Sequence, residues 1–504
     1  LEIPSLLSNV APGGPSVTLT RLVFEGNTRL SDETLRASLP DNALAQPLDL
    51  AGMQALADAL STTYRNAGYP FARVFVPAQN MQGGVLTLKV VEGRYGQVKA
   101  TGNAQPEVLA TAQRYLNGLV PGEVIQAAEL ERATLLLSDL PGLLMSPVVR
   151  PGQASGTGDL DVFVQTLPDT NGEVGLDNHG NRYNGSYRAR ANVNWNSPFA
   201  VGDQLQLRSL ITNEGMWLGS LNYQIPVNGD GLKAMAGVSH TYYELGQEFA
   251  ASQSNGTADV LHAGVSYPLV RSQQRNVSIS LQWQHKRMHD RQDAANTQSR
   301  KRSDTLPLAI NFDARDRWAG GGINYGALTY TYGQLKLDNT LRATDATTAR
   351  THGGFSKLQL DVARVQSLPV PGLTLFAHGV GQWTGQNLDS SEGFGLGGPS
   401  GVRAYPVGEG YGDKGWLGQL ELRYSNGDWA PFAFYDAGRV TIKTNPWTPD
   451  ANGRSISGGG VGVRYAQGAI SAEVYLAWRD QGGTSQADTQ NKNPRMWASV
   501  GYRF

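Results

Sequence analysis

The pattern of apolar and polar residues changes once along the chain, near Pro168. Before that point, apolar residues recur at helical spacing in segments such as 49–67, and short alternating segments such as 85–91 lie between them. After it, helical spacing disappears, and alternating segments of strand length are separated by Gly, Asn, Asp and Pro. The pattern predicts a mixed α/β part up to residue 168 and an all-β part over residues 169–504.

The mixed part contains the same succession of elements twice: a strand, two helices and two further strands. The first copy is predicted at 18–25, from Ser31, at 49–67, 71–76 and 85–91, and the second at 97–101, 106–119, 127–137, 146–150 and 160–166. We therefore expect two small α+β domains of β-α-α-β-β order, over residues 18–94 and 95–168. Residues 1–17 are left as an N-terminal linker.

The segments of the all-β part have one apolar and one polar face. In residues 186–195, for example, arginine and asparagine alternate with alanine, valine, tyrosine and tryptophan. The polar faces suit a wet interior, and the apolar faces, with aromatic residues near segment ends, suit a lipid-facing band. A soluble sandwich or propeller would instead show faces rich in Ile, Leu and Val, or a fixed period of about 40–50 residues. We therefore predict a transmembrane antiparallel β-barrel.

The barrel is predicted to have about 16 strands, because this number leaves about 21 residues per strand and connection, enough for membrane strands of ~9–11 residues. The last segment places Tyr502 and Phe504 on one apolar face, and we expect these two residues to form the assembly signal. The expected strands start near Gly172, Ser186, Asp203, Trp217, Gly231, Gly256, Arg275, Lys301, Gly322, Gly354, Gly372, Gly415, Pro431, Ile456, Gly468 and Pro494.

Composition narrows the class of protein further. The 504 residues include 61 glycines and only 17% charged residues, and the formal net charge is −1. The chain therefore lacks the excess of positive charge that is typical of nucleic-acid binders. No run of apolar residues reaches the ~18 residues of a membrane helix. The chain has no cysteine, which excludes disulfides, thiolate metal sites and cysteine nucleophiles.

No motif for catalysis or metal binding stands out. The patterns H-E-x-x-H and G-x-S-x-G are absent, and His285 and His289 share a strand face but lie too far apart to chelate a metal. The Gly-rich segment 393–401 lacks the Lys-Ser/Thr of a phosphate loop and is expected to be a loop hinge. The basic cluster 300–302 is expected at a solvated loop or barrel rim. We expect no catalytic residue, no metal and no cofactor.

Two sets of motifs resemble a known family. Residues 22–31 (LVFEGNTRLS), 67–74 (AGYPFARV) and 91–98 (VEGRYGQV) resemble polypeptide-transport-associated (POTRA) domains. Residues 402–405 (VRAY) resemble the Val-Arg-Gly-Tyr tip of a long re-entrant loop, and residues 434–438 (FYDAG) resemble its partner motif Phe-x-Asp-x-Gly on the barrel wall. Two POTRA domains before a barrel of this size are similar to the outer-membrane transporters of two-partner secretion, which export haemolysins, adhesins and contact-dependent inhibition toxins.

This resemblance assigns the candidate site residues. The loop-tip motif is Val402, Arg403, Ala404 and Tyr405, with Ala404 in place of the family's glycine, and the wall motif is Phe434, Asp436 and Gly438. By strand parity Asp436 faces the lumen, so an Arg403 fork folded back into the barrel would pair with it bidentately. From the residues alone, Arg403 as an exposed loop charge remains the alternative. Such transporters also begin with a plug helix and a linker, and residues 1–17 are too short and too rich in Pro and Gly to supply both.

The resemblance implies a bacterial outer-membrane protein with periplasmic POTRA domains that capture a large β-helical exoprotein, which crosses the barrel without ATP. Outer-membrane lipid and, during insertion, the barrel-assembly machinery are further expected partners, nucleic acid is not, and the chain is expected to be a monomer. Three alternatives stay open. The first is a barrel-assembly factor, which also joins POTRA domains to a barrel but has a larger number of POTRA domains. The second is an outer-membrane lipase or protease, which should show a catalytic motif. The third is a passive porin, which needs no soluble domains before its barrel.

Overall fold

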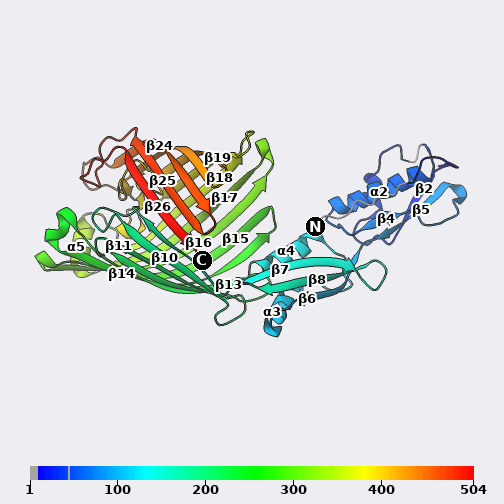
Figure 1. The fold of residues 1–504 in the computed structure, drawn as a ribbon, viewed down its shortest axis with the longest axis horizontal. Coiled ribbons are helices and arrows are strands. Elements are labelled where there is room, and N and C mark those ends of the chain that lie inside the picture. The colour runs from blue at the N-terminus through cyan, green and yellow to red at the C-terminus, as the bar shows by residue number, and fades with distance from the viewer. Residues whose placement is uncertain (1–9, 44–45) are drawn as a thin grey trace. The chain divides into compact units, whose positions relative to one another are not determined.

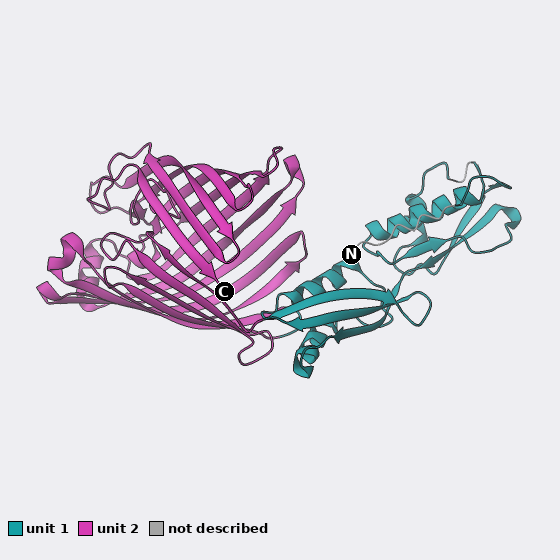
Figure 2. Ribbon diagram, viewed as in Figure 1, with its two compact units in different colours: residues 1–167, 228–230 teal, residues 168–227, 231–504 magenta. Residues whose placement is uncertain are grey.

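The computed structural model describes residues 10–43 and 46–504 and has two compact units, shown in teal and magenta in Figure 2. The first comprises the chain up to Leu167 together with Asn228–Asp230, and the second comprises Pro168–Val227 and Gly231–Phe504. The predicted N-terminal linker lies partly outside the described residues, since positions 1–9 are not among them.

The first α+β domain has a three-stranded sheet of order β2-β5-β4, in which β2 runs parallel to β5. Its elements are β1 (Val17–Thr18), β2 (Arg21–Glu25), α1 (Asp32–Ala37), β3 (Pro47–Leu48), α2 (Leu50–Asn66), β4 (Arg73–Phe75), the 3-10 turn η1 (Gln82–Gly84) and β5 (Val85–Val91). The helices begin where side chains cap them: Ser31 accepts from the Thr34 N–H, and Asp49 accepts from the Gly52 N–H at 2.8 Å.

One predicted strand is wrong in detail. The segment 18–25 is not continuous, because β1 pairs with β3 whereas β2 pairs with β5 in a different sheet. Leu19 and Leu22 are both buried, and two residues of opposite strand parity can both face the core only if the chain turns between them.

A buried carboxylate joins the end of β5 to the turn after β2. Glu92 is 4% exposed and accepts hydrogen bonds from the Thr28 hydroxyl, from the Thr28 and Arg29 N–H groups at 2.6 and 2.7 Å, and from the Tyr64 hydroxyl at 3.1 Å. Burial alone would raise the pKa of Glu92, but these hydrogen bonds outweigh it and hold the pKa below its ordinary value. The carboxylate is therefore ionised in the folded domain and fixes the turn.

The second α+β domain repeats the order and sheet topology of the first. It comprises β6 (Arg94–Thr101), α3 (Pro106–Leu116), α4 (Ala127–Ser138), β7 (Leu143–Pro151) and β8 (Thr157–Thr166). The sheet order is β6-β8-β7, with β6 parallel to β8, and the core includes the fully buried Leu116, Leu137 and Leu160. The predicted pair of β-α-α-β-β domains is confirmed.

The second unit is a closed barrel of sixteen antiparallel strands (Figure 1). The strands are β9 (Thr170–Asp177), β10 (Arg188–Asn196), β11 (Gln204–Thr212), β12 (Trp217–Pro226), β13 (Lys233–Glu244), β14 (Ser254–Arg271), β15 (Arg275–Gln292), β16 (Thr297–Asp316), β17 (Gly322–Leu337), β18 (Gly353–Ser367), β19 (Leu373–Trp383), β22 (Lys414–Tyr424), β23 (Trp429–Thr441), β24 (Gly453–Gln467), β25 (Ile470–Arg479) and β26 (Arg495–Arg503). All begin within four residues of the predicted positions.

Short connections follow every second strand at the end where the chain enters the barrel, and longer ones occupy the opposite end. The connections at the opposite end carry the 3-10 turns η2 (Gln247–Ser252) and η3 (Asp293–Ala295) and the helix α5 (Asn339–Thr347), and that of η3 is short. The 3-10 turn η4 (Trp318–Gly320) lies at the entry end. None of the helices described here has both the length and the apolar character to cross a membrane.

The two faces of the wall differ as predicted. Met496, Val500, Tyr502 and Phe504 all point outward and are 45–55% exposed. On β23 the residues of the opposite parity, Phe432, Phe434 and Asp436, are buried inside the barrel. Alternation with a period of two thus separates an apolar outer surface from a filled interior.

Candidate functional site

The candidate site is built by the loop 384–413, which joins β19 to β22 and folds back onto the inner wall. It contains η5 (Ser390–Glu392), β20 (Phe394–Gly395) and β21 (Tyr411–Gly412), and β20 pairs with β21. At the tip, the Val402 N–H donates to the Leu396 carbonyl at 2.7 Å and the Gly398 N–H donates to the Tyr405 carbonyl at 3.0 Å. The Gly-rich segment is therefore part of a hydrogen-bonded, buried tip, and its prediction as a hinge is not what the structure shows.

Arg403 and Asp436 lie in direct contact inside the barrel. The Arg403 Nε and Nη2 donate to the two Asp436 carboxylate oxygens at 2.8 Å each, and the Arg403 backbone N–H adds a bond of 3.1 Å to the same group. The Arg403 side chain is 6% exposed and that of Asp436 is 0% exposed. This is the bidentate, water-excluded geometry in which an arginine–carboxylate pair fixes orientation as well as charge.

A second carboxylate shares Arg403. The Arg403 Nη1 donates to Glu421 on β22 at 2.6 Å, and Glu421 also accepts from Arg423 and Arg464 at 2.6 Å each. Arg464 in turn donates to Glu473 on β25 at 2.6 Å. The tip arginine therefore joins a chain of alternating charges that runs across strands β22 to β25, in which each buried carboxylate has a cationic partner.

Aromatic rings of the wall surround this charge cluster. The Arg403 guanidinium lies 3.5 Å from the Phe434 ring centre and 5.7 Å from that of Tyr475. The Trp497 indole N–H donates to the Arg403 carbonyl at 2.7 Å. Cation–π contacts of this kind are strongest where water is excluded, so the rings stabilise the arginine in addition to positioning it.

The other motif residues fit against the wall. Val402 and Tyr405 are fully buried, and the Tyr405 hydroxyl donates to the Gln481 carbonyl at 2.8 Å. Ala404 lies on Gly458 of β24, where any β-carbon would come within 2.4 Å of the alanine methyl. Gly438 likewise makes room for Leu396 of the tip, since a β-carbon there would lie 2.7 Å from the leucine methyl. Glycine on the wall thus permits the close approach of the loop.

A second anchor holds the loop on its return path. Glu409 is fully buried and accepts from the Arg454 Nη2 at 2.6 Å. The same carboxylate accepts from the N–H groups of Gln486 and Ala487, at 2.8 and 2.9 Å, in the connection between β25 and β26. Two separate carboxylate–arginine contacts therefore bind the loop to the inner wall.

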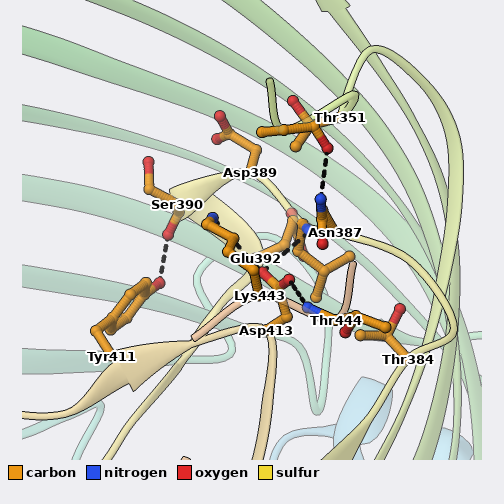
Figure 3. A network of polar contacts seen from close by, with 12 residues as sticks. Thr351, Thr384, Asn387, Asp389, Ser390, Glu392, Tyr411, Asp413, Lys443 and Thr444 are labelled. Atoms are coloured by element: carbon orange, nitrogen blue, oxygen red, sulfur yellow. Dashed lines mark hydrogen bonds and ion pairs between the residues drawn. The ribbon is translucent and has the colours of Figure 1, made fainter. Parts of the chain in front are cut away.

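The root of the loop is fixed by a further polar network, shown in Figure 3. Glu392 of η5 forms ion pairs with Lys286 at 2.6 Å and Lys357 at 2.9 Å, from strands β15 and β18. Asp413 accepts from the Leu388 and Thr444 N–H groups at 3.1 and 2.8 Å (Figure 3). The loop is thus attached at its root, its tip and its return segment.

The predicted assembly residues lie at the barrel seam. Strand β26 pairs with β9 over Ser499–Arg503, and Phe504 extends the seam by exchanging two backbone hydrogen bonds with Gly172, at 2.9 and 3.0 Å. The Tyr502 and Phe504 side chains point outward and are 52% and 55% exposed. They therefore do not contribute to the loop site.

The histidines provide no site for a metal ion. His285 pairs with Asp304 at 2.7 Å, whereas His289 contacts Gln298 at 3.2 Å. Over residues 10–43 and 46–504, no group of three His, Asp or Glu side chains is arranged to hold a metal. The residues that sequence reasoning missed are instead acids and an aromatic of the loop site, Glu421, Glu409 and Trp497. Strand parity places Glu421 in the lumen, but it does not reveal which lumen residues the loop will meet.

The chain joins two POTRA-like domains to a sixteen-strand barrel, and a re-entrant loop is bound to the inner wall of that barrel. This combination defines an outer-membrane protein transporter of the POTRA and barrel class. The family model of haemolysin secretion/activation proteins ShlB/FhaC/HecB matches residues 156–465, and the ShlB-type POTRA domain model matches residues 17–93. The chain belongs to this family. It is an outer-membrane transporter of two-partner secretion, with its POTRA domains in the periplasm, as predicted.

Relatives agree with this assignment. The chain is 24% identical over 413 residues to the heme/hemopexin transporter protein HuxB of Haemophilus influenzae (strain 86-028NP), which covers 81% of this chain and 72% of HuxB. It is 26% identical over 336 residues to the outer membrane transporter CdiB of Escherichia coli O6:K15:H31, covering 63% and 54%. The solved structure of CdiB from Escherichia coli matches the fold with a TM-score of 0.79 at 19% identity, over 100% of this chain and 93% of CdiB.

Proposed function

We propose that this transporter captures one large, unfolded, β-helical exoprotein in the periplasm through its POTRA domains and exports it through the barrel without ATP or any enzymatic step. The observation that supports this most directly is the loop tip bound inside the barrel by Arg403, Asp436 and Glu421. This loop is attached to the inner wall at its root, its tip and its return segment. Its relatives include a heme/hemopexin transporter protein and an outer membrane transporter, which supports a transport function.

The latched loop is proposed to keep the transporter in its working conformation. The tip lies against the last five strands, next to the seam at which the barrel closes. The charge chain from Arg403 to Glu473 spans four adjacent strands, β22 to β25. Loss of the arginine would therefore release the tip and at the same time leave two wall carboxylates without one of their partners, so we assign Arg403 to positioning the loop rather than to contact with cargo.

Cargo capture is proposed at the edge of the second POTRA sheet. Strand β7 is an edge strand of the order β6-β8-β7, and one of its sides pairs with no strand of this sheet. Pro147 and Pro151 have no N–H to donate, so pairing would use the other residues of β7. Leu144 and Val148 of β7 are 50% and 42% exposed, and Phe163 of the neighbouring β8 is 36% exposed. An extended cargo segment could add a strand to this edge and cover the exposed apolar side chains, which is how β-augmentation gains both affinity and specificity.

Export of a cargo protein tests this function. With the complete transporter in cells, the double substitution Leu144→Glu and Val148→Glu should lower secreted exoprotein at least tenfold, because it puts charge where cargo would bury apolar surface. Val120→Glu, at another exposed apolar position of the same domain that is 51% exposed, is the matched control and should secrete normally. Equal secretion by all three proteins would contradict capture at this edge.

The remaining partners follow from the seam and the outer surface. We propose that the barrel-assembly machinery recognises the last strand through Tyr502 and Phe504, that lipid covers the apolar outer face, and that the transporter works as a monomer without nucleic acid or cofactor. The closed sixteen-strand order supports a monomer, because β26 already pairs with β9 of the same chain.

A further inference from the structure

On the outward faces of strands β15, β16 and β17, the type of residue changes with height along the barrel wall. Leu281, Leu308 and Tyr330 lie opposite one another in register and are 41%, 40% and 48% exposed. The next outward positions toward the extracellular end are the aromatic residues Trp283 and Tyr332, which are 42% and 57% exposed. An apolar band bordered by exposed aromatic rings marks the level at which the hydrocarbon core of a membrane ends.

Three cations form the outward row above this border. Arg287 pairs in register with Arg302, and Arg302 pairs with Lys336, so one cation stands on each of three adjacent strands. All three residues are exposed. We refer to Arg287, Arg302 and Lys336 as the basic row.

Neighbouring acids balance the basic row only in part. Asp259 of β14 lies in register with Arg287 and pairs with His240 at 2.6 Å. The ion pairs of the described chain include none for Arg302 or Lys336, and Arg287 donates only to the His285 ring, at 3.1 Å. The nearest acid in the row below, Asp304, is paired with His285 at 2.7 Å. Like charges directly opposite each other on neighbouring strands are destabilising, so the arrangement costs free energy unless an anion lies between them.

The height of the row places it at the outer edge of the lipid headgroup layer. Arg287 lies four residues beyond Trp283 and Lys336 lies four residues beyond Tyr332, while Arg302 lies four residues beyond the outward Leu306 of the middle strand. At a rise of ~3.4 Å per residue and a strand tilt of ~40°, this places the row about 10 Å above the border. The hydrocarbon core is ~30 Å thick and the bilayer with its headgroups is ~40–45 Å thick, so each headgroup layer extends about 5–8 Å. The row lies at the outer edge of this layer, within reach of long arginine and lysine side chains.

We propose that the basic row is a binding site for the phosphate groups of a phosphorylated glycolipid in the outer leaflet, whose acyl chains lie along the apolar band below. Two planar guanidinium groups and one ammonium group supply the donors, and arginine in particular can bind a phosphate bidentately. Neighbouring strands lie ~4.8 Å apart, so a phosphate in the gap between two adjacent cations can accept hydrogen bonds from both.

The test compares lipid binding by the purified full-length transporter and by the variant Arg287→Gln/Arg302→Gln/Lys336→Gln. Detergent-solubilised protein is titrated with bisphosphorylated lipid A, and bound lipid is counted by native mass spectrometry. A cation at a membrane surface contributes about a fivefold gain in binding. Loss of three should therefore weaken binding by the triple variant about a hundredfold. Raising the salt concentration should weaken wild-type binding and have little effect on the variant.

Two controls make the result specific. The substitution Arg21→Gln/Arg73→Gln/Lys89→Gln removes the same charges from exposed POTRA positions and should leave binding unchanged. Unchanged lipid A binding by the basic-row variant, with its barrel still showing heat-modifiable migration, overturns the proposal. Equal competition by phosphatidylglycerol overturns it as well, because the site would then not distinguish the outer-leaflet glycolipid from an inner-leaflet phospholipid. If the triple variant does not fold, the salt titration and the single variant Arg302→Gln decide the question.

Discussion

Replacing Arg403 by alanine should release the loop tip from the wall while the barrel stays folded. The substitution removes two side-chain bonds of 2.8 Å to Asp436 and one of 2.6 Å to Glu421. The bond of 3.1 Å from the Arg403 backbone N–H to Asp436 can survive. Asp436, which is 0% exposed, is left without its cation, and breaking such a buried pair typically costs about 3–5 kcal/mol. Glu421 keeps Arg423 and Arg464, so the lower end of this range applies.

A free-energy change of about 3 kcal/mol raises the population of the released tip by about a hundredfold. The chain contains no cysteine, so a single cysteine reports this directly. With Ala404→Cys, at a position that is 2% exposed, labelling by a membrane-impermeant maleimide should be slow in the otherwise native protein. Adding Arg403→Ala should accelerate it about a hundredfold, as expected when labelling follows local opening. Ala343→Cys on the exposed side of α5 should label at the same rate in both backgrounds.

Partner substitutions separate this explanation from others. Asp436→Ala should be milder than Arg403→Ala, because Glu421 still holds the arginine, and the double variant should be no worse than Arg403→Ala alone. Arg403→Lys should behave as an intermediate, since an ammonium group cannot reach both carboxylates with the fork of a guanidinium. Unchanged labelling in Arg403→Ala, or fully additive effects of the two substitutions, would refute the reasoning.

Three further outcomes are expected. Glu409→Gln should loosen the return segment of the loop, because it weakens the buried contact with Arg454. Secretion should fall while immunoblots show a normal amount of inserted barrel. Normal secretion would show that this anchor is dispensable. Deleting Phe504 should reduce folded barrel, seen as heat-modifiable protein at native expression, because two backbone bonds to Gly172 close the seam; unchanged levels would leave the residue a lipid contact only. Glu92→Ala should destabilise the first POTRA domain by about 1–3 kcal/mol. Because folding lowers the pKa of Glu92, the stability that this carboxylate contributes is present above the unfolded pKa and is lost as the pH falls through the folded pKa. If thermal melts showed the same difference between variant and native protein at pH 7 and at pH 3, they would contradict this.

The fold was largely predictable because it rests on short-range periodicity. Alternation places each barrel strand, and helical spacing places the POTRA helices, with a side-chain cap at Ser31 and Asp49 in the first domain. The site was only half predictable. The resemblance brought Arg403 and Asp436 together, but Glu421, Glu409 and Trp497 are distant in sequence from the residues they contact, and their roles depend on where the loop meets the wall. No local pattern encodes that meeting point.

The same reasoning explains the two differences in detail. The segment 18–25 alternates like one strand, yet the burial of both Leu19 and Leu22 requires a turn that pattern alone does not show. The glycines of 393–401 are typical of a mobile hinge in sequence, whereas in the structure they belong to a tip closed by hydrogen bonds such as that from Val402 to Leu396. Tertiary contact, not local preference, decides both segments.

The central claim, that cargo passes through the barrel, is tested most directly by crosslinking during export. A photo-reactive residue is placed at Gln282 or at Leu281, neighbours on β15 whose side chains face the lumen and the lipid, respectively. While exoprotein is being secreted, position 282 should form a crosslink to the cargo and position 281 should not. Crosslinks from position 281 alone, or from neither position while secretion continues at its normal rate, would contradict export through the lumen.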